Sequence, residues 1–240
     1  MTYLIWLGRF FFKSRNYLFP ALVLALYAAR PPQSTIFNSA LIESITDIVA
    51  ISLATVGVLI RFSVIGYGRV NRDGQNKTAH ADTLFTNGMF GISRNPLYLG
   101  NILIYAGIFR LHGAQEVFIA GTLLFIFIYI TIILSEEVYL SKTFGAEYAT
   151  YKADVPRLLP RLKNWAHAKE NMRFSWAKAL LSEYNVATQA MLMVGLGWWY
   201  EVASQTGAAA IPVFSAVAIS CAVVFAASMR AIKHDPSIHL

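Results

Sequence analysis

Residues 94–137 read RNPLYLGNILIYAGIFRLHGAQEVFIAGTLLFIFIYITIILSEE, and this stretch decides the fold. It contains two apolar runs, Leu97–Phe109 and Val117–Leu134, separated by a short polar turn. Apolar runs of this kind predict helices that enter a lipid bilayer. Because the turn is short, the two helices should pack antiparallel as a hairpin. The hairpin then brings Arg94 and the pair Glu136-Glu137 to the same end.

The composition supports a membrane protein. Of the 240 residues, 56% are apolar and only 14% are charged, against roughly 45–50% and 25% in soluble domains. The net charge of +7 is spread over the loops. This excludes a nucleic-acid binder, which gathers its charge on one basic domain, and indicates attraction to anionic lipids at the cytoplasmic face. With one cysteine, Cys221, no intrachain disulfide and no cysteine-based metal site can form, and we predict no metal centre.

Six candidate membrane spans follow one another along the chain. They are Tyr17–Ala29, Ile45–Ile60, Leu97–Phe109, Val117–Leu134, Tyr184–Tyr200 and Ile211–Met229. If the N-terminus is cytoplasmic, 18 of the 20 Lys and Arg residues fall on the cytoplasmic side, and only Arg30 and Arg110 lie outside. This is the bias of the positive-inside rule. We therefore expect an all-α, multi-pass integral membrane protein with about six transmembrane helices and cytoplasmic termini. Its oligomeric state stays open.

The spans divide the chain into three parts. Residues 1–44 form an N-terminal membrane segment, and residues 45–165 form a core that contains the hairpin 97–134. Residues 166–240 hold an interfacial helix and a two-helix extension. The interfacial helix is predicted from apolar residues at helical spacing, with basic residues between them. These apolar residues are Trp165, Met172, Trp176 and Leu180.

The first helix of the hairpin has a well-marked start. Pro96 lacks a backbone N–H and suits the first helical turn, and Ser93 or Asn95 is placed to cap it. Arg94 then lies at the membrane surface, with Tyr98 one turn inside. A helix N-terminus beside an arginine favours an anion such as a carboxylate or phosphate. An ordinary helix start with an interfacial arginine is the open alternative.

Glu136 and Glu137 close the second apolar run. Placing a carboxylate near hydrocarbon costs several kcal/mol unless it is paired or functional. At a predicted helix C-terminus it also faces the negative end of the helix dipole. The pair therefore indicates a functional site or an ion pair with Arg94 or Arg61, and a solvated pair at the end of the span is the alternative.

A third stretch, residues 144–160, carries aromatic residues. Tyr148 and Tyr151 share a helical face with Phe144, and Pro156 and Pro160 end the helix. Aromatic rings near a carboxylate can hold a sulfonium or ammonium cation. Packing in an ordinary core is the alternative for each ring.

These three stretches, in this order, resemble the isoprenylcysteine carboxyl methyltransferase and phospholipid methyltransferase group of membrane enzymes. The similarity covers roughly residues 45–161. It consists of a Gly88-x-Phe90 turn, an Arg-His-Pro-x-Tyr-x-Gly motif, a Glu-Glu pair and a Phe-Gly-x-x-Tyr-x-x-Tyr stretch that ends in Val-Pro. In this chain Asn95 replaces the histidine. Residues 45–165 are thus a predicted methyltransferase core.

The resemblance implies an enzyme that uses S-adenosylmethionine, with the cofactor pocket at the cytoplasmic face. It implies cofactor contacts for His80, Gly88, Phe90, Arg94, Asn95, Pro96, Leu97, Tyr98, Gly100 and Glu137. It implies catalytic roles for Arg94, Glu136, Glu137 and Tyr98. Asparagine can donate and accept hydrogen bonds but is no base near neutral pH, so proton removal at Asn95 is not expected.

The expected reaction is methyl transfer to a lipophilic acceptor in the membrane. A prenylcysteine carboxylate, a phospholipid amine and a lipid phosphate are the open possibilities. An anionic acceptor needs alignment and a dry site more than a base, whereas an amine would need deprotonation by Glu136 or Glu137. A small transporter or channel without catalysis is the alternative function. Transporters place ionisable groups near the middle of their spans, whereas here we expect such groups at one end.

Overall fold

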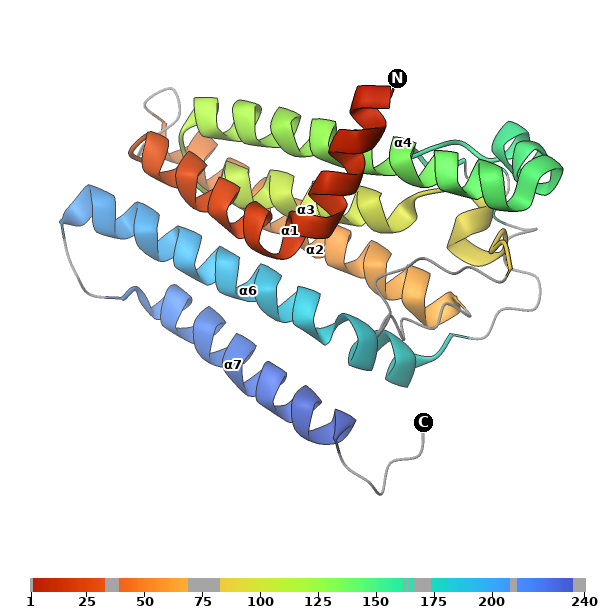
Figure 1. The fold of residues 1–240 in the computed structure, drawn as a ribbon. Coiled ribbons are helices and arrows are strands. Elements are labelled where there is room, and N and C mark those ends of the chain that lie inside the picture. The colour runs from red at the N-terminus through yellow and green to blue at the C-terminus, as the bar shows by residue number, and fades with distance from the viewer. Residues whose placement is uncertain are drawn as a thin grey trace.

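The chain is all-helical in the computed structural model, which describes residues 2–32, 39–68, 83–161, 163, 165, 174–207 and 211–234. Its elements are α1 (Thr2–Ala29), α2 (Ala40–Tyr67), the short 3-10 helix η1 (Gly88–Gly91), α3 (Pro96–Arg110), α4 (Gln115–Asp154), α6 (Trp176–Thr206) and α7 (Val213–Lys233). The long helices form one bundle (Figure 1). The predicted all-α class is confirmed within the described residues.

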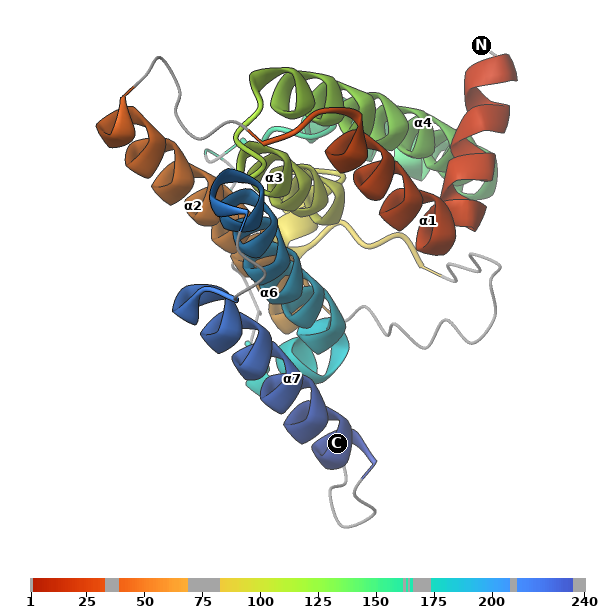
Figure 2. The same ribbon diagram turned by 90° about the vertical axis from the view of Figure 1, so that its left-hand side faces the viewer.

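The helices contact one another in the order α1, α4, α3, α2, α6, α7 (Figure 2). Five of the six predicted spans lie within a helix, and the sixth, Ile211–Met229, begins two residues before α7. Within the described ranges, three helices are long and apolar enough to cross a membrane: α2 from Leu41 to Tyr67, α4 and α7. With 15 residues, α3 is only about 22 Å long at 1.5 Å per residue, which is shorter than a hydrocarbon core of roughly 30 Å. Most of its residues are buried, so α3 is an interior helix between α2 and α4.

Small residues set the close contact between α2 and α3. A Cβ atom added to Gly57 would lie 2.5 Å from the carbonyl oxygen of Gly100, and one added to Gly107 would lie 2.4 Å from that of Ala50. Without side chains at these positions the two backbones can touch, as in many membrane helix pairs. The contact places the start of α3 beside the last turns of α2.

The fourth helix differs from its prediction. It continues 20 residues beyond Leu134, to Asp154, so Glu136 and Glu137 lie inside a helix. The predicted conflict with the dipole at a helix C-terminus is therefore wrong. The helix is broken at Gly145, where φ is +50° and ψ is −117°, a conformation that is essentially open only to glycine. As predicted, the helix ends before Pro156.

Successive helices run in alternating directions. Tyr27 near the end of α1, His112 in the turn after α3 and Tyr200 near the end of α6 meet at one end of the bundle. At the other end, the amide of Ser175 before α6 donates to the carbonyl of Gly66 in the last turn of α2, at 2.9 Å. This is the alternation that the distribution of basic residues requires. Most of the predicted interfacial helix lies outside the described residues, and its last part, Trp176 to Leu180, belongs to α6.

Candidate active site

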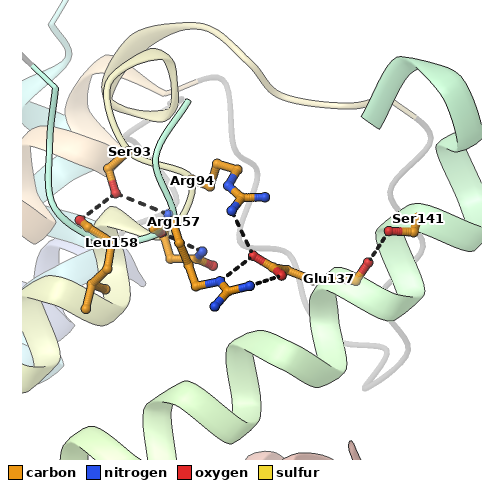
Figure 3. A network of polar contacts seen from close by, with 7 residues as sticks. Ser93, Arg94, Glu137, Ser141, Arg157 and Leu158 are labelled. Carbon is orange, nitrogen blue, oxygen red and sulfur yellow. Dashed lines mark hydrogen bonds and ion pairs between the residues drawn. The ribbon is translucent and has the colours of Figure 1, made fainter. Parts of the chain in front are cut away.

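Glu137 is held between two arginines, Arg94 just before α3 and Arg157 after α4 (Figure 3). Nη2 of Arg94 lies 3.2 Å from its Oε1. Arg157 makes two contacts, from Nε to Oε1 and from Nη2 to Oε2, both 2.9 Å long. The side chains of Arg94 and Glu137 are each only 7% exposed. The two residues that were predicted to meet at one end of the hairpin therefore form a buried ion pair.

The guanidinium of Arg94 has two nitrogen donors that do not contact Glu137. Its Nε and Nη1 atoms are buried and have no hydrogen-bond partner among the described residues. Buried donors without partners are uncommon and costly. Hydrogen bonding to Glu137 raises the pKa of the Arg157 guanidinium. Two guanidinium groups around one carboxylate leave a formal excess of one positive charge. Such a site is suited to an anionic group.

Both arginines are positioned by the segment that follows α4, residues 155–161, which we call the strap. The segment before α3 pairs with this strap through backbone and side-chain hydrogen bonds. The contacts run from the Arg94 amide to the Pro156 carbonyl (2.9 Å), from the Arg161 amide to the Ile92 carbonyl (2.9 Å) and from Ser93 Oγ to the Leu158 carbonyl (2.8 Å). Because Gly145 redirects the chain, the strap returns to the start of α3.

Asn95 also joins the start of α3 to the strap. It is the residue before α3, but its side chain makes no capping hydrogen bond. Instead its Nδ2 donates to the carbonyl oxygen of Arg157 at 2.8 Å, and Ser93 likewise donates to the strap. The predicted side-chain cap of α3 is therefore wrong, whereas Pro96 does begin the helix.

Glu136 faces a different partner from Glu137. Consecutive helix residues are about 100° apart around the axis, so the two carboxylates cannot share one environment. The hydroxyl of Tyr98 donates to Oε1 of Glu136 at 2.5 Å. The ring of Tyr98 also lies 5.5 Å from that of Tyr129 in α4. Tyr98 and Glu136 thus link the first turn of α3 to α4.

The predicted turn before the site lies partly within the described residues. Gly88 begins η1 with φ of +71°, a conformation that favours glycine. The carbonyl of Phe90 accepts a hydrogen bond of 2.7 Å from the hydroxyl of Tyr151, which ties η1 to the end of α4. His80 lies outside the described residues. The predicted cofactor contacts of these three residues stay predictions.

Gly100 and Leu97 face α2. A Cβ atom on Gly100 would lie 2.7 Å from Cγ of Arg61 and 2.8 Å from the carbonyl oxygen of Gly57. The absence of a side chain at Gly100 therefore serves helix packing. The carbonyl oxygen of Leu97 lies 3.5 Å from Nη1 of Arg61.

The predicted aromatic face packs beside the ion pair. Tyr148 and Tyr151 are buried with Val155 in a small core, against which Phe144 packs. Tyr148 is 2% exposed and lies close enough to Glu137 and Arg94 to interact with both electrostatically. The rings form one wall of the site.

Sequence reasoning missed a second buried ion pair. Arg61 was one of the two arginines that the sequence offered as a partner for Glu136-Glu137. Instead it is 3% exposed, and its Nε and Nη2 lie 2.8 and 2.7 Å from Oε2 of Glu183 in α6. The signal in the sequence that could have indicated this pair was a single acidic residue, Glu183, directly before the apolar run that starts at Tyr184.

More ionisable side chains are buried within the helices than the sequence analysis predicted. Asp47 in α2 is buried, contrary to the expectation that ionisable groups lie only at one end. It is close enough to Arg110 at the end of α3 for their charges to attract. Opposite charges side by side are what buried ionisable groups in membranes require. Among the described residues, no group of three or more His, Cys, Asp or Glu side chains is placed to hold a metal ion.

Comparison with known proteins agrees with the motifs. Residues 45–147 match the family model of the phospholipid methyltransferases. The chain is also similar to the cobalt-zinc-cadmium resistance protein CzcN of Cupriavidus metallidurans, with 33% identity over 112 residues. That alignment covers 47% of this chain and 46% of the relative, so it spans less than half of either protein. No solved structure matches.

The matched region contains most of α2, all of η1 and α3, and α4 as far as Glu147. It includes the ion pair between Arg94 and Glu137 and the contact between Tyr98 and Glu136. Together with three helices that are apolar enough to cross a membrane, the match supports a location in the membrane. The predicted resemblance is therefore confirmed over residues 45–147, which match the phospholipid methyltransferase family model.

Proposed function

We propose that this protein is an integral membrane methyltransferase that uses S-adenosylmethionine and acts on a lipid-borne acceptor at the start of α3. The observation that carries the proposal is the buried Arg94, which is paired with Glu137 and has two N–H groups without a partner among the described residues. Its position within the family match supports methyl transfer.

The residues at this site fit the cofactor. The free donors of Arg94 suit a carboxylate, such as the one on the amino-acid part of S-adenosylmethionine, and the buried ring of Tyr148 beside Glu137 suits a nearby cation. When bound, the cofactor supplies a methyl group activated by its sulfonium. The chain's own residues bind and orient the reacting molecules. Arg94 holds an anionic group, Glu137 fixes Arg94, and Tyr98 fixes Glu136.

The contacts of the two carboxylates favour one class of acceptor. Both oxygens of Glu137 contact arginines, and Oε1 of Glu136 accepts from Tyr98. A carboxylate held by two guanidinium groups is a poor base. We therefore propose an acceptor that is already an oxyanion, a carboxylate or a phosphate on a lipid, in preference to an amine that must lose a proton. The site would face the cytoplasm, with both termini on that side.

The test combines binding and transfer. Purified protein in lipid nanodiscs is incubated with methyl-labelled S-adenosylmethionine and a total lipid extract. We expect saturable cofactor binding in calorimetry and label in the lipid fraction. Label released as methanol by mild alkali would identify a carboxyl ester, and mass spectrometry of the stable products would separate a methyl phosphate from an N-methyl amine. An N-methyl product would overturn the oxyanion acceptor.

A pair of variants makes the test specific to the site. Glu137→Gln should reduce transfer by more than about tenfold, because loss of one partner leaves Arg94 buried with its charge unmatched. Glu147→Gln changes an exposed carboxylate on the same helix and should leave transfer unchanged. No cofactor binding and no labelled lipid with the wild-type protein would reject the proposed activity.

A further inference from the structure

A line of polar contacts runs from α6 to the first turns of α3. Oε2 of Glu183 in α6 lies 2.7 Å from Nη2 and 2.8 Å from Nε of Arg61 in α2. Nη1 of the same arginine donates to Oδ1 of Asn101 in α3 at 2.6 Å and lies 3.5 Å from the carbonyl oxygen of Leu97. One guanidinium therefore joins three helices.

The pair is deeply buried and crosses a boundary of the family match. The side chains of Arg61 and Glu183 are 4% and 1% exposed. Arg61 lies within residues 45–147, whereas Glu183 lies outside that range. Removing one partner from a buried pair leaves an uncompensated charge and is strongly destabilising. The matched region thus depends on α6 for the counterion of an arginine that touches its central helix.

The line continues toward the candidate catalytic residues. Asn101 is one helical turn after Leu97, and Tyr98 directly follows Leu97. Asn101 also lies close enough to Tyr129 of α4 for the two polar groups to interact, and the ring of Tyr129 lies 5.5 Å from that of Tyr98. Arg61 therefore acts on the part of α3 that presents Tyr98 to Glu136.

We propose that Glu183 is a positioning residue for methyl transfer, supplied by the C-terminal helices and acting through Arg61 on the first turns of α3. The inference rests on the proposed function for its catalytic consequence. It gives α6 a role in the site, because α6 then fixes the orientation in which Tyr98 meets Glu136.

The opposite end of α3 offers a matched control. Arg110 is 5% exposed, and it donates to Gln115 and Thr46, both at 3.2 Å. It is as buried as Arg61 and also joins α2 to α3. It lies 12 positions after Tyr98, about 18 Å away along the helix. A change at Arg110 perturbs the same helix pair without touching the first turns of α3.

The first experiment compares Arg61→Lys, the double variant R61M/E183M and Arg110→Lys in nanodiscs. Thermal unfolding, the KM for S-adenosylmethionine and kcat are measured for each. Lysine keeps the charge but cannot reproduce the guanidinium geometry, and the double variant replaces a buried pair by apolar side chains, which is often tolerated. We expect kcat to fall at least about tenfold in both variants, with KM within about threefold, and Arg110→Lys to keep wild-type kcat. Wild-type kcat in the folded double variant would overturn the proposal.

A second measurement does not depend on activity. The amides of Tyr98 and Leu99 both bond to the carbonyl of Asn95 at 3.1 Å. In R61M/E183M these amides should exchange with deuterium at least about tenfold faster than in wild type, while amides in the last turn of α3 keep their rates. Faster exchange with no methyl transfer by the wild-type protein would reject the proposed function and retain the coupling. Unchanged exchange in the first turns would reject the coupling itself.

Discussion

Asn95 donates its side-chain amide to the backbone carbonyl of Arg157 at 2.8 Å, and so fastens the start of α3 to the residue that pairs with Glu137. The related family motif has histidine at this position. A neutral histidine also carries one ring N–H donor and can satisfy the same carbonyl. The ability that the two residue types share is therefore to donate a hydrogen bond, and Asn95 makes this bond without basic character.

The role of Asn95 is tested by two substitutions of different chemistry. Asn95→His should keep methyl transfer within a few-fold of wild type, because a donor remains. Asn95→Asp has the same shape but sets an acceptor against the Arg157 carbonyl, and should cost about 1–3 kcal/mol of stability and most of the activity. Initial rates and thermal unfolding check both. Equal activity of the two variants would contradict the holding role.

Substitutions at Gly100 and Gly107 distinguish an effect on helix packing from an effect on the geometry of the site. Both glycines allow α2 and α3 to touch, so Gly100→Ala and Gly107→Ala should each lower the unfolding temperature. Only Gly100→Ala moves Arg61 and the first turns of α3, so only this variant should reduce kcat, by about tenfold or more. If Gly100 instead admits the cofactor, as its motif position suggests, the KM for S-adenosylmethionine will rise more than kcat falls.

The break in α4 is a backbone requirement. Nothing lies within 4 Å of a Cβ atom built on Gly145, so Gly145→Ala meets no steric obstacle from neighbours. It should still destabilise by about 1–3 kcal/mol, because φ of +50° with ψ of −117° is strained for a residue with a side chain. Ala149→Ser, at an exposed position in the same helix, serves as the control and should stay within about 0.5 kcal/mol. Equal unfolding temperatures for the two variants would argue against a required break.

His112 makes stability depend on pH. It is fully buried, and this burial lowers its pKa below the ordinary 6.5. Between the lowered and the ordinary pKa the unfolded chain binds more protons than the folded one, so the free energy of unfolding rises with pH in that window. The protein should lose stability as pH falls below about 6.5. His112→Gln keeps a donor for the Tyr27 carbonyl and should flatten this part of the profile.

The orientation of the bundle can be tested with single cysteines in a Cys221→Ala background. Glu116, in the first turn of α4, and Lys142, in the same helix beyond the glutamate pair, are both exposed. If the site faces the cytoplasm, Glu116→Cys should react with an impermeant thiol reagent in intact cells, and Lys142→Cys only after lysis. The opposite labelling pattern would invert the proposed topology.

The parts of the fold that sequence predicts are those with local signals. Pro96 starts α3 and Pro156 follows the end of α4, because proline restricts the backbone wherever it occurs. The meeting of Arg94 and Glu137 followed from the short turn of the hairpin. By contrast, Leu134 marks only where the apolar run stops, and a helix can continue into polar sequence, so the continuity of α4 beyond Leu134 was missed.

The parts that sequence does not predict depend on pairing between distant residues. No local pattern connects Arg61 to Glu183, which lie 122 positions apart, and each alone resembles an ordinary charge at the end of a span. Asp47 was overlooked for a similar reason, because a single carboxylate hardly changes the hydropathy of an apolar run. Partners of this kind become visible only once the helices are arranged in space.

The shortness of α3 has a consequence for biogenesis. A helix of 15 residues that is mostly enclosed by its neighbours has only a short apolar stretch. On its own it would partition poorly from the translocation machinery into lipid. It should therefore enter the bilayer together with α4, as one unit delivered after both have left the ribosome. The end of the hairpin that carries Arg94 and Glu137 would then be assembled only when its second half has been synthesised.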